Sequence, residues 1–161
     1  MAEAVLHLGS NLGNRIKNIS LAKLFIERQI AKISHSSSLY ETEAWGVTDQ
    51  KNFINTAVII ETDLDPESVL DKIHQIERLL GRVRYERWSE RTIDIDIIFY
   101  NDQIIEKANL KIPHAELTNR NFVLIPLDEI IPDRIDPKTG RTIRELKEAC
   151  SDTSKVWLYE E

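Results

Sequence analysis

The hydrophobic pattern of the chain changes period several times, and each period predicts a different element. Short aliphatic runs are typical of strands, and a more polar, β-branched run predicts a strand with one exposed side. The predicted strands span residues 4–8, 33–40, 53–61 and 92–100. Apolar residues spaced three and four apart predict one helix over 14–30 and a second that begins at Asp65-Pro66 and ends at Gly81.

These elements follow the order strand, helix, strand, strand, helix, strand, which is the split βαβ pattern of ferredoxin-like domains. We therefore expect an α+β fold whose antiparallel sheet carries its helices on one face and leaves the other face free for a site. C-terminal additions are expected to follow: a short strand near Gln103, a turn at Pro113-His114, an apolar segment over 122–131 and a helix over 143–150. No repeat or linker interrupts the 161 residues, so we expect one domain spanning 1–161.

Composition and charge narrow the function classes. Acidic residues outnumber basic ones by 27 to 21, and the formal net charge of −6 disfavours general binding to nucleic acids or membrane surfaces. Cys150 is the only cysteine, so neither an intramolecular disulfide nor a cysteine-rich zinc site is expected. The sequence has no apolar run long enough to span a bilayer and no leader-like N-terminus, which indicates a cytoplasmic protein.

Two acids inside the last predicted strand suggest a metal site. Side chains alternate along a strand, so Asp94 and Asp96 share one face while their isoleucine neighbours face the core. Residues two apart lie roughly 6.5 to 7 Å from each other, and a divalent cation between two such carboxylates relieves their repulsion. Carboxylates acting together with bound phosphate suit Mg²⁺. The alternative is a pair of solvated acids on an exposed strand.

The loop before this strand is rich in arginine. Arg82, Arg84, Arg87 and Arg91 fall within ten residues, and Trp88 lies among them. Guanidinium groups match phosphate oxygens, and an indole ring offers a flat face to a base. Some of these cations could instead answer the dipole of the preceding helix. Beside an acid pair the cluster favours magnesium-dependent phosphate transfer from a nucleotide, with this loop closing over the bound phosphates.

Taken together, the motifs resemble those of the 6-hydroxymethyl-7,8-dihydropterin pyrophosphokinases of folate biosynthesis. The segment Arg91-Thr92-Ile93-Asp94-Ile95-Asp96, with Glu86-Arg87-Trp88 upstream, is the most specific match. The other matching stretches are Leu8-Gly9-Ser10-Asn11-Leu12-Gly13, Leu39-Tyr40-Glu41-Thr42, Gln50-Lys51-Asn52-Phe53-Ile54-Asn55, Gly81-Arg82-Val83-Arg84, Pro113-His114 and Asn119-Arg120-Asn121-Phe122-Val123-Leu124. They run in order from the first predicted strand to about Pro132.

The resemblance implies a ferredoxin-like enzyme that moves a pyrophosphoryl group from ATP to the hydroxymethyl oxygen of the pterin and leaves AMP. It also implies that Asp94 and Asp96 bind two Mg²⁺ ions and that both act in catalysis with Arg82 and Arg91. The residues implied to bind the nucleotide are Glu77, Arg84, Trp88, Arg91, Ile97, His114 and Arg120. Those implied to bind the pterin are Thr42, Glu43, Trp45, Phe53, Asn55 and Phe122.

The sequence also departs from the family pattern and leaves alternatives open. Ser89-Glu90 stands where many members have Gly-Pro, which bears on how the arginine-rich loop closes. Another magnesium-dependent transferase on the same fold would release ADP or free pyrophosphate instead of AMP. An RNA-binding sheet is disfavoured because Asp94 and Asp96 would repel phosphates. The expected partners are ATP and the pterin alone, without nucleic acid, membrane or an obligate protein partner, and His7 and His35 are expected to be structural.

Overall fold

The computed structural model describes residues 1–44, 51–81 and 92–160. Its elements in chain order are β1 (Ala2–Ser10), α1 (Arg15–Gln29), β2 (Ile33–Ser36), β3 (Tyr40–Thr42), β4 (Phe53–Thr62), α2 (Pro66–Leu79), β5 (Asp94–Tyr100), β6 (Ile105–Lys107), β7 (Leu110–Ile112), the 3₁₀ helix η1 (Leu117–Asn119), α3 (Asn121–Ile130), α4 (Ile143–Ala149) and β8 (Val156–Leu158). In the described ranges no helix has the length and apolar character that crossing a bilayer requires.

One antiparallel sheet organises the chain. Its strands lie in the order β5-β1-β4-β3-β8, with β2 also paired to β4, while β6 and β7 form a separate hairpin. The predicted strands over 4–8, 53–61 and 92–100 are confirmed, and so are the helices predicted over 14–30 and from Asp65 onward. Asp65 caps α2 through its side chain, which accepts a hydrogen bond from the Ser68 amide.

Three sequence predictions need correction. The strand expected over 33–40 is two short strands. Between them the Ser37 hydroxyl accepts a hydrogen bond from the Ala57 amide and donates one to the Ser38 carbonyl, so side-chain bonds replace part of the strand ladder. Gln103 lies in a turn closed by its amide on the Tyr100 carbonyl, and the strands follow over 105–107 and 110–112. The third correction is that helices pack on both faces of the sheet and not on one.

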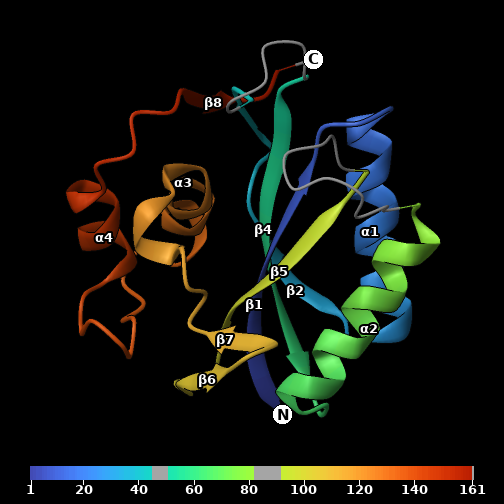
Figure 1. Ribbon diagram of the computed structural model, residues 1–161, viewed down its shortest axis with the longest axis horizontal. Helices are drawn as coiled ribbons and strands as arrows, with labels where there is room; N and C mark the ends of the chain where they lie inside the picture. Colours follow the sequence, from blue (N-terminus) through green and yellow to red (C-terminus); the bar gives the residue numbers. More distant parts are fainter. Residues whose placement is uncertain (45–50, 82–91, 161) are drawn as a thin grey trace.

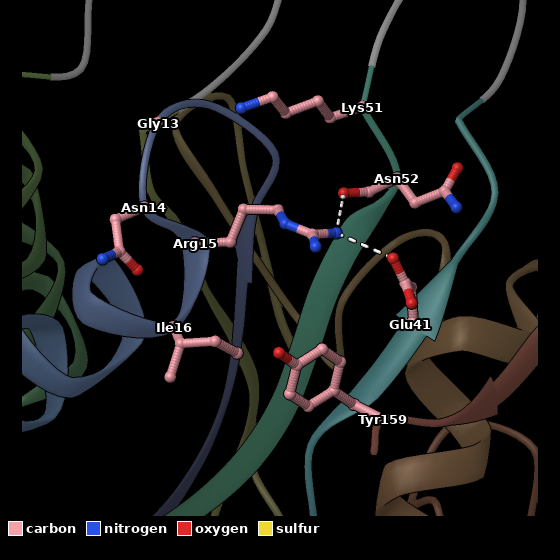
Figure 2. A pocket seen from close by; sticks show the side chains of 8 residues that line it. All are labelled: Gly13, Asn14, Arg15, Ile16, Glu41, Lys51, Asn52 and Tyr159. Atoms are coloured by element: carbon pink, nitrogen blue, oxygen red, sulfur yellow. Dashed lines mark hydrogen bonds and ion pairs between the residues drawn. The ribbon is translucent and has the colours of Figure 1, made fainter. Parts of the chain in front are cut away.

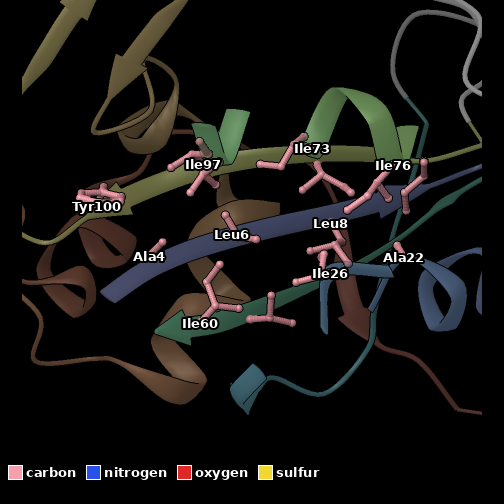
Figure 3. Close-up of a cluster of buried hydrophobic side chains, with 14 of the residues drawn as sticks. Ala4, Leu6, Leu8, Ala22, Ile26, Ile60, Ile73, Ile76, Ile97 and Tyr100 are labelled. Atoms are coloured by element: carbon pink, nitrogen blue, oxygen red, sulfur yellow. The ribbon is translucent and has the colours of Figure 1, made fainter. Parts of the chain in front are cut away.

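Helices cover both faces of the sheet, whereas the sequence predicted helices on one face only. Helices α1 and α2 pack on one side, and α3 and α4 lie on the other (Figure 1). Figure 3 shows the first core, where even-numbered residues of β1 meet Ile26 of α1 and Ile73 and Ile76 of α2. The second core exists because α3 has its own apolar side, formed by Val123, Leu124 and Leu127 and buried against Val5, Ala57 and Ile59.

A β-bulge in β5 changes which residues face which core. Leu6 pairs with Ile97 but Val5 pairs with Phe99, so Ile98 is an extra residue in the ladder. Before the bulge, Ile93, Ile95 and Ile97 are buried on the α1 and α2 side; after it, Ile98 and Phe99 join the core under α3. The predicted isoleucine face of this strand is therefore confirmed.

Candidate active site

Asp94 and Asp96 lie on the face of the sheet that α3 partly covers, opposite the isoleucine face. Both are half-buried. Strand pairing places Asp94 opposite Gly9 of β1 and Asp96 opposite His7, and on the other side of β1 Gly9 pairs with Asn55 of β4. A row of three residues, Asn55, Gly9 and Asp94, therefore crosses the sheet.

The structure leaves little room for a side chain at Gly9. A Cβ atom at this position would lie 3.0 Å from Oδ1 of Asn55 and 3.7 Å from the Phe53 ring. Asn55 cannot easily move away, since it is 1% exposed and its Nδ2 donates a hydrogen bond of 2.7 Å to Oγ1 of Thr42. The missing side chain leaves space on the sheet between the amide of Asn55 and the acid pair.

Several of the residues predicted to bind the pterin lie close together on strands β3 and β4. Thr42 pairs with Phe53 across β3 and β4, and Asn55 lies two residues further along β4 on the same face. Phe53 is half-buried, so its ring is available at the open end of this face. Glu43 follows β3, and both its amide and its carboxylate bond to the backbone of Lys155.

Phe122 lies in the first turn of α3 and contacts His7, which we expected from the sequence to have a structural role. Its carbonyl oxygen lies 3.1 Å from Nε2 of His7, and the two rings are 6.0 Å apart between centroids. Pro126 lies four residues later in α3 and has no N–H, so this carbonyl lacks the usual helical donor, and His7 supplies one. The Arg120 guanidinium carbon lies 5.7 Å from the centre of the Phe122 ring.

His7 is a neutral donor in this setting. Burial lowers its pKa to about 4, and the nearby His114 and Arg120 also act to lower it, against the hydrogen bond to Phe122. Because a carbonyl only accepts, Nε2 carries the proton. The alternation of side chains along β1 could have indicated a role for His7. The even-numbered residues of this strand face the core, so His7 and Gly9 lie together on the opposite face.

His114 approaches the acid pair from the segment after β7. Its Nε2 lies 3.8 Å from Oδ1 of Asp96. Nδ1 accepts a hydrogen bond of 3.1 Å from the Glu116 amide, so in the neutral ring the proton is on Nε2, which faces Asp96. The backbone amide of His114 also donates to the Ile98 carbonyl, which ties this turn to β5.

The two aspartates fit a magnesium site that depends on its substrate. No group of three or more histidine, cysteine, aspartate or glutamate side chains able to hold a metal occurs in the described part of the chain. Mg²⁺ commonly takes one or two carboxylates from the protein and completes its octahedron with phosphate oxygens and water. Two half-exposed carboxylates on one strand face suit that division, with the phosphates of a nucleotide supplying the other ligands.

Other predicted residues lie behind the site or outside the described ranges. The Glu77 carboxylate is buried and accepts from the Ile95 amide on the outer edge of β5, so it fixes α2 to this strand. The Ile97 side chain is buried on the α1 and α2 side, facing away from Asp96. The predicted residues that lie outside the described ranges are Trp45, Arg82, Arg84, Arg87, Trp88 and Arg91, and the predicted loop closure with them.

A cavity of about 550 Å³ lies on the opposite face, next to the start of α1 (Figure 2). It is lined by Gly13, Asn14, Arg15, Ile16, Glu41, Lys51, Asn52 and Tyr159. The Arg15 guanidinium already pairs with Glu41 at 2.8 Å and donates to the Asn52 carbonyl at 2.9 Å. None of the eight lining residues is among those predicted for the site, so this cavity is separate from the acid pair.

Comparison with known proteins identifies the family of this chain. The family model of 7,8-dihydro-6-hydroxymethylpterin-pyrophosphokinase (HPPK) matches residues 5–132. The chain belongs to this family. Among curated HPPK relatives, the 2-amino-4-hydroxy-6-hydroxymethyldihydropteridine pyrophosphokinase of Synechocystis sp. is 40% identical over 156 residues, covering 96% of this chain and 78% of its own. The Haemophilus influenzae enzyme of the same name is 37% identical over 159 residues, covering 98% of this chain and 99% of its own.

Solved structures support the HPPK fold. The crystal structure of wild-type Plasmodium falciparum HPPK-DHPS with SDX-DHP superposes with a TM-score of 0.73 at 23% identity and covers 92% of this chain. Since this chain spans 43% of the length of that protein, the match concerns one part of it. At this identity the likeness concerns the fold: a mixed α and β architecture with an antiparallel sheet.

Proposed function

We propose that this HPPK-family chain transfers pyrophosphate from ATP to the hydroxymethyl group of 6-hydroxymethyl-7,8-dihydropterin, giving AMP and the pterin pyrophosphate in folate biosynthesis. The observation that carries the proposal is the row Asn55, Gly9 and Asp94. Strands are about 4.8 Å apart, so about 10 Å separates the Asn55 and Asp94 backbones. That span holds a flat pterin whose polar edge meets Asn55 and whose hydroxymethyl group points to phosphates at the acid pair.

The pterin half divides into polar and apolar roles. Asn55 and Thr42, already joined by a hydrogen bond, would read the donors and acceptors of the ring edge, together with Glu43 and Trp45. Phe53 and Phe122 come from different elements and would stack on the two faces of the ring. Since Gly9 has no side chain, position 9 of β1 leaves room beside the Phe53 ring.

The nucleotide half contains the acids. Asp94 and Asp96 would hold two Mg²⁺ ions, which when bound neutralise the ATP phosphates and polarise the transferring group. Arg82, Arg84 and Arg91 would contact the phosphates and Trp88 would cover the site. His114 and Arg120 would contact the nucleotide. Glu77 and the Ile97 backbone would support it from behind β5.

The chemical step is an in-line displacement at the β-phosphorus of ATP. A bond forms from the hydroxymethyl oxygen to that phosphorus, the bond from the same phosphorus to the oxygen bridging to the α-phosphate breaks, and AMP leaves with the bridging oxygen. The hydroxymethyl proton is released to solvent water. The neutral His7, which pairs with Asp96 across the two strands, adds no positive charge of its own on this face.

The test is a single incubation with ATP, MgCl₂ and the hydroxymethyl dihydropterin, followed by separation of the nucleotides. AMP and pterin pyrophosphate should appear in equal amounts, and a chelator should stop both. ADP as the sole nucleotide product would indicate a different transferase on this fold. Tight RNA retention on filters at physiological salt, without any turnover, would indicate a binding module instead.

The strand order β5-β1-β4 with β2 and β3 beside β4 supports a ferredoxin-like core, to which α3, α4 and β8 are additions. We propose further that residues 1–161 act as one domain in the cytoplasm, with ATP and the pterin as the only obligate partners.

A further inference from the structure

The C-terminal segment, residues 152–158, runs from α4 past α3 to the edge of the sheet (Figure 1). It lies beyond residue 132, where the match to the family model ends. Within seven residues it bonds to two separate parts of the predicted pterin site. The contacts are specific enough to assign it a role.

The first set of contacts surrounds Asn121, the residue between Arg120 and Phe122. Oδ2 of Asp152 accepts a hydrogen bond of 3.1 Å from the Asn121 amide, at the start of α3. Arg120, at the cap position, makes no side-chain cap bond of its own, so Asp152 acts as a cap supplied by a remote part of the chain. The Asn121 side-chain amide donates back to the carbonyls of Asp152 and Ser154, at 3.3 and 2.8 Å.

Asp152 is itself held in place. Its Oδ1 accepts from the amide and the hydroxyl of Ser154, at 2.9 and 2.7 Å. Burial alone would favour the neutral acid, but the hydrogen bonds from Ser154 and Asn121, with the charge of Arg120, hold the pKa of Asp152 below its usual range. An ionised carboxylate at a helix N-terminus is favourable and gives a stronger hydrogen bond than a neutral acceptor would.

The second set of contacts begins one residue later, on the other side of the site. The Glu43 amide donates to the Lys155 carbonyl, and the Lys155 amide donates to Oε1 of Glu43, both at 3.2 Å. Strand β8 then pairs with β3, placing Val156 opposite Thr42. Residues 152–155 thus join the start of α3, which carries Phe122, to the strand that carries Thr42.

We propose that Asp152 and the C-terminal segment form a brace that fixes Phe122 relative to Thr42 and Asn55, and so set the affinity for the pterin more than the affinity for ATP. The inference rests on the proposed function, since Phe122 and Thr42 matter together only if the pterin binds between them. Asp152 touches neither substrate in this arrangement, so it is a positioning residue.

The experiment compares Asp152→Ala and Asp152→Asn with the wild type by calorimetry, using the pterin and, separately, a non-hydrolysable ATP analogue with Mg²⁺. Losing a hydrogen bond to a charged acceptor should weaken pterin binding about tenfold in the Ala variant, with Asn closer to wild type because it retains an acceptor. The ATP analogue should bind within about twofold of wild type. Glu160→Gln, in the exposed part of the same tail, is the matched control.

Amide hydrogen exchange gives a readout that does not depend on substrate. Asp152→Ala should speed exchange at Asn121 and at Glu43, whereas the far end of α3 at Ile130 should be unchanged. A second variant, the chain ending at Ser151, should show the same pattern more strongly. Should that chain fail to fold, the point variants still decide.

Two outcomes would overturn the brace. Unchanged pterin affinity in Asp152→Ala would show that the contacts do not position Phe122. Equal losses for the pterin and the ATP analogue would show a general stability role. A wild-type chain that binds no pterin would instead overturn the proposed function, and the exchange data would still report whether Asp152 holds α3.

Discussion

Nε2 of His7 donates a hydrogen bond of 3.1 Å to the carbonyl of Phe122, the carbonyl that Pro126 leaves without a helical donor. A proline inside α3 and a histidine inside β1 are each unfavourable choices when considered alone. Together they are compatible, because the His7 ring donates the hydrogen bond that Pro126 cannot donate to the Phe122 carbonyl. The pair ties the residue predicted to stack on the pterin to the strand that runs between Asn55 and Asp94.

The first prediction is that His7 makes stability depend on pH. Its pKa is about 4 in the fold and near 6.5 when unfolded, so between these values the unfolded chain binds more protons and acid destabilises the fold. From pH 7 to pH 5 the free energy of unfolding should fall by about 2 kcal/mol from this group, and the loss should level off about one pH unit below the folded pKa. Urea unfolding in metal-free buffer measures the change.

His7→Gln is the informative variant, because its amide can donate to the same carbonyl but does not titrate. It should lose about 2 kcal/mol of the pH dependence between pH 7 and pH 5. His35→Gln is the control, since His35 is exposed on β2. A His7→Gln protein with the full wild-type pH dependence would contradict the assignment.

The second prediction concerns the acid pair. Asp94→Ala and Asp96→Ala should each lower AMP formation by roughly a thousandfold, because removing a metal ligand loses several kcal/mol of charge stabilisation. Both side chains are half-exposed and the buried isoleucines remain, so circular dichroism and the thermal midpoint should change little. Asp102→Ala, in the exposed turn after β5, is the control. Wild-type turnover in either Asp94 or Asp96 variant would rule out a metal role for that residue.

The first half of the fold could be predicted from the sequence because its signals are local. The alternation that buries Ile93 and Ile95 is a two-residue pattern, and it alone places Asp94 and Asp96 on the other face. The α2 start at Asp65-Pro66 is similarly local, since one side chain caps it. Such features do not require knowledge of which strand lies next to which.

What could not be predicted depends on partners far along the chain. Strand β8 pairs with β3, which lies more than a hundred residues earlier in the sequence, and no local pattern in Val156–Leu158 predicts this pairing. The second helical layer was missed because Pro126 interrupts the helical pattern of α3, and its compensation by His7 comes from β1. The bulge at Ile98 follows from pairing with β1 and not from its own residue type.

The third prediction separates the two ligands. Phe122→Ala should raise the pterin dissociation constant about tenfold, since the variant loses a stacking contact of about 0.5 to 1.5 kcal/mol together with buried area. The His7 bond should survive, because it uses the backbone carbonyl. Calorimetry with the ATP analogue should show almost no change. Phe25→Ala, on the core side of α1, is the control and should lower stability without favouring either ligand; equal losses in Phe122→Ala would point to a packing role.

The fourth prediction concerns the empty space at Gly9. The backbone conformation at Gly9 allows an alanine. Gly140 is the opposite case: its φ of +75° disfavours an alanine, although no atom lies within 4 Å of an added Cβ. The new methyl group would instead meet Oδ1 of Asn55 at 3.0 Å and push the amide away from Thr42. Gly9→Ala should therefore weaken pterin binding about tenfold, whereas Gly140→Ala should cost about 1 kcal/mol of stability and leave pterin binding unchanged.

A double-mutant cycle identifies the cause of the Gly9 effect. If the methyl group acts by displacing the Asn55 amide, then in an Asn55→Ala background there is no amide left to displace. Adding Gly9→Ala to that background should change pterin affinity by less than about twofold, against about tenfold in the wild type, which is a coupling of roughly 1 kcal/mol. Equal effects in both backgrounds would mean that the methyl group blocks the ring directly and that Asn55 is not the group displaced.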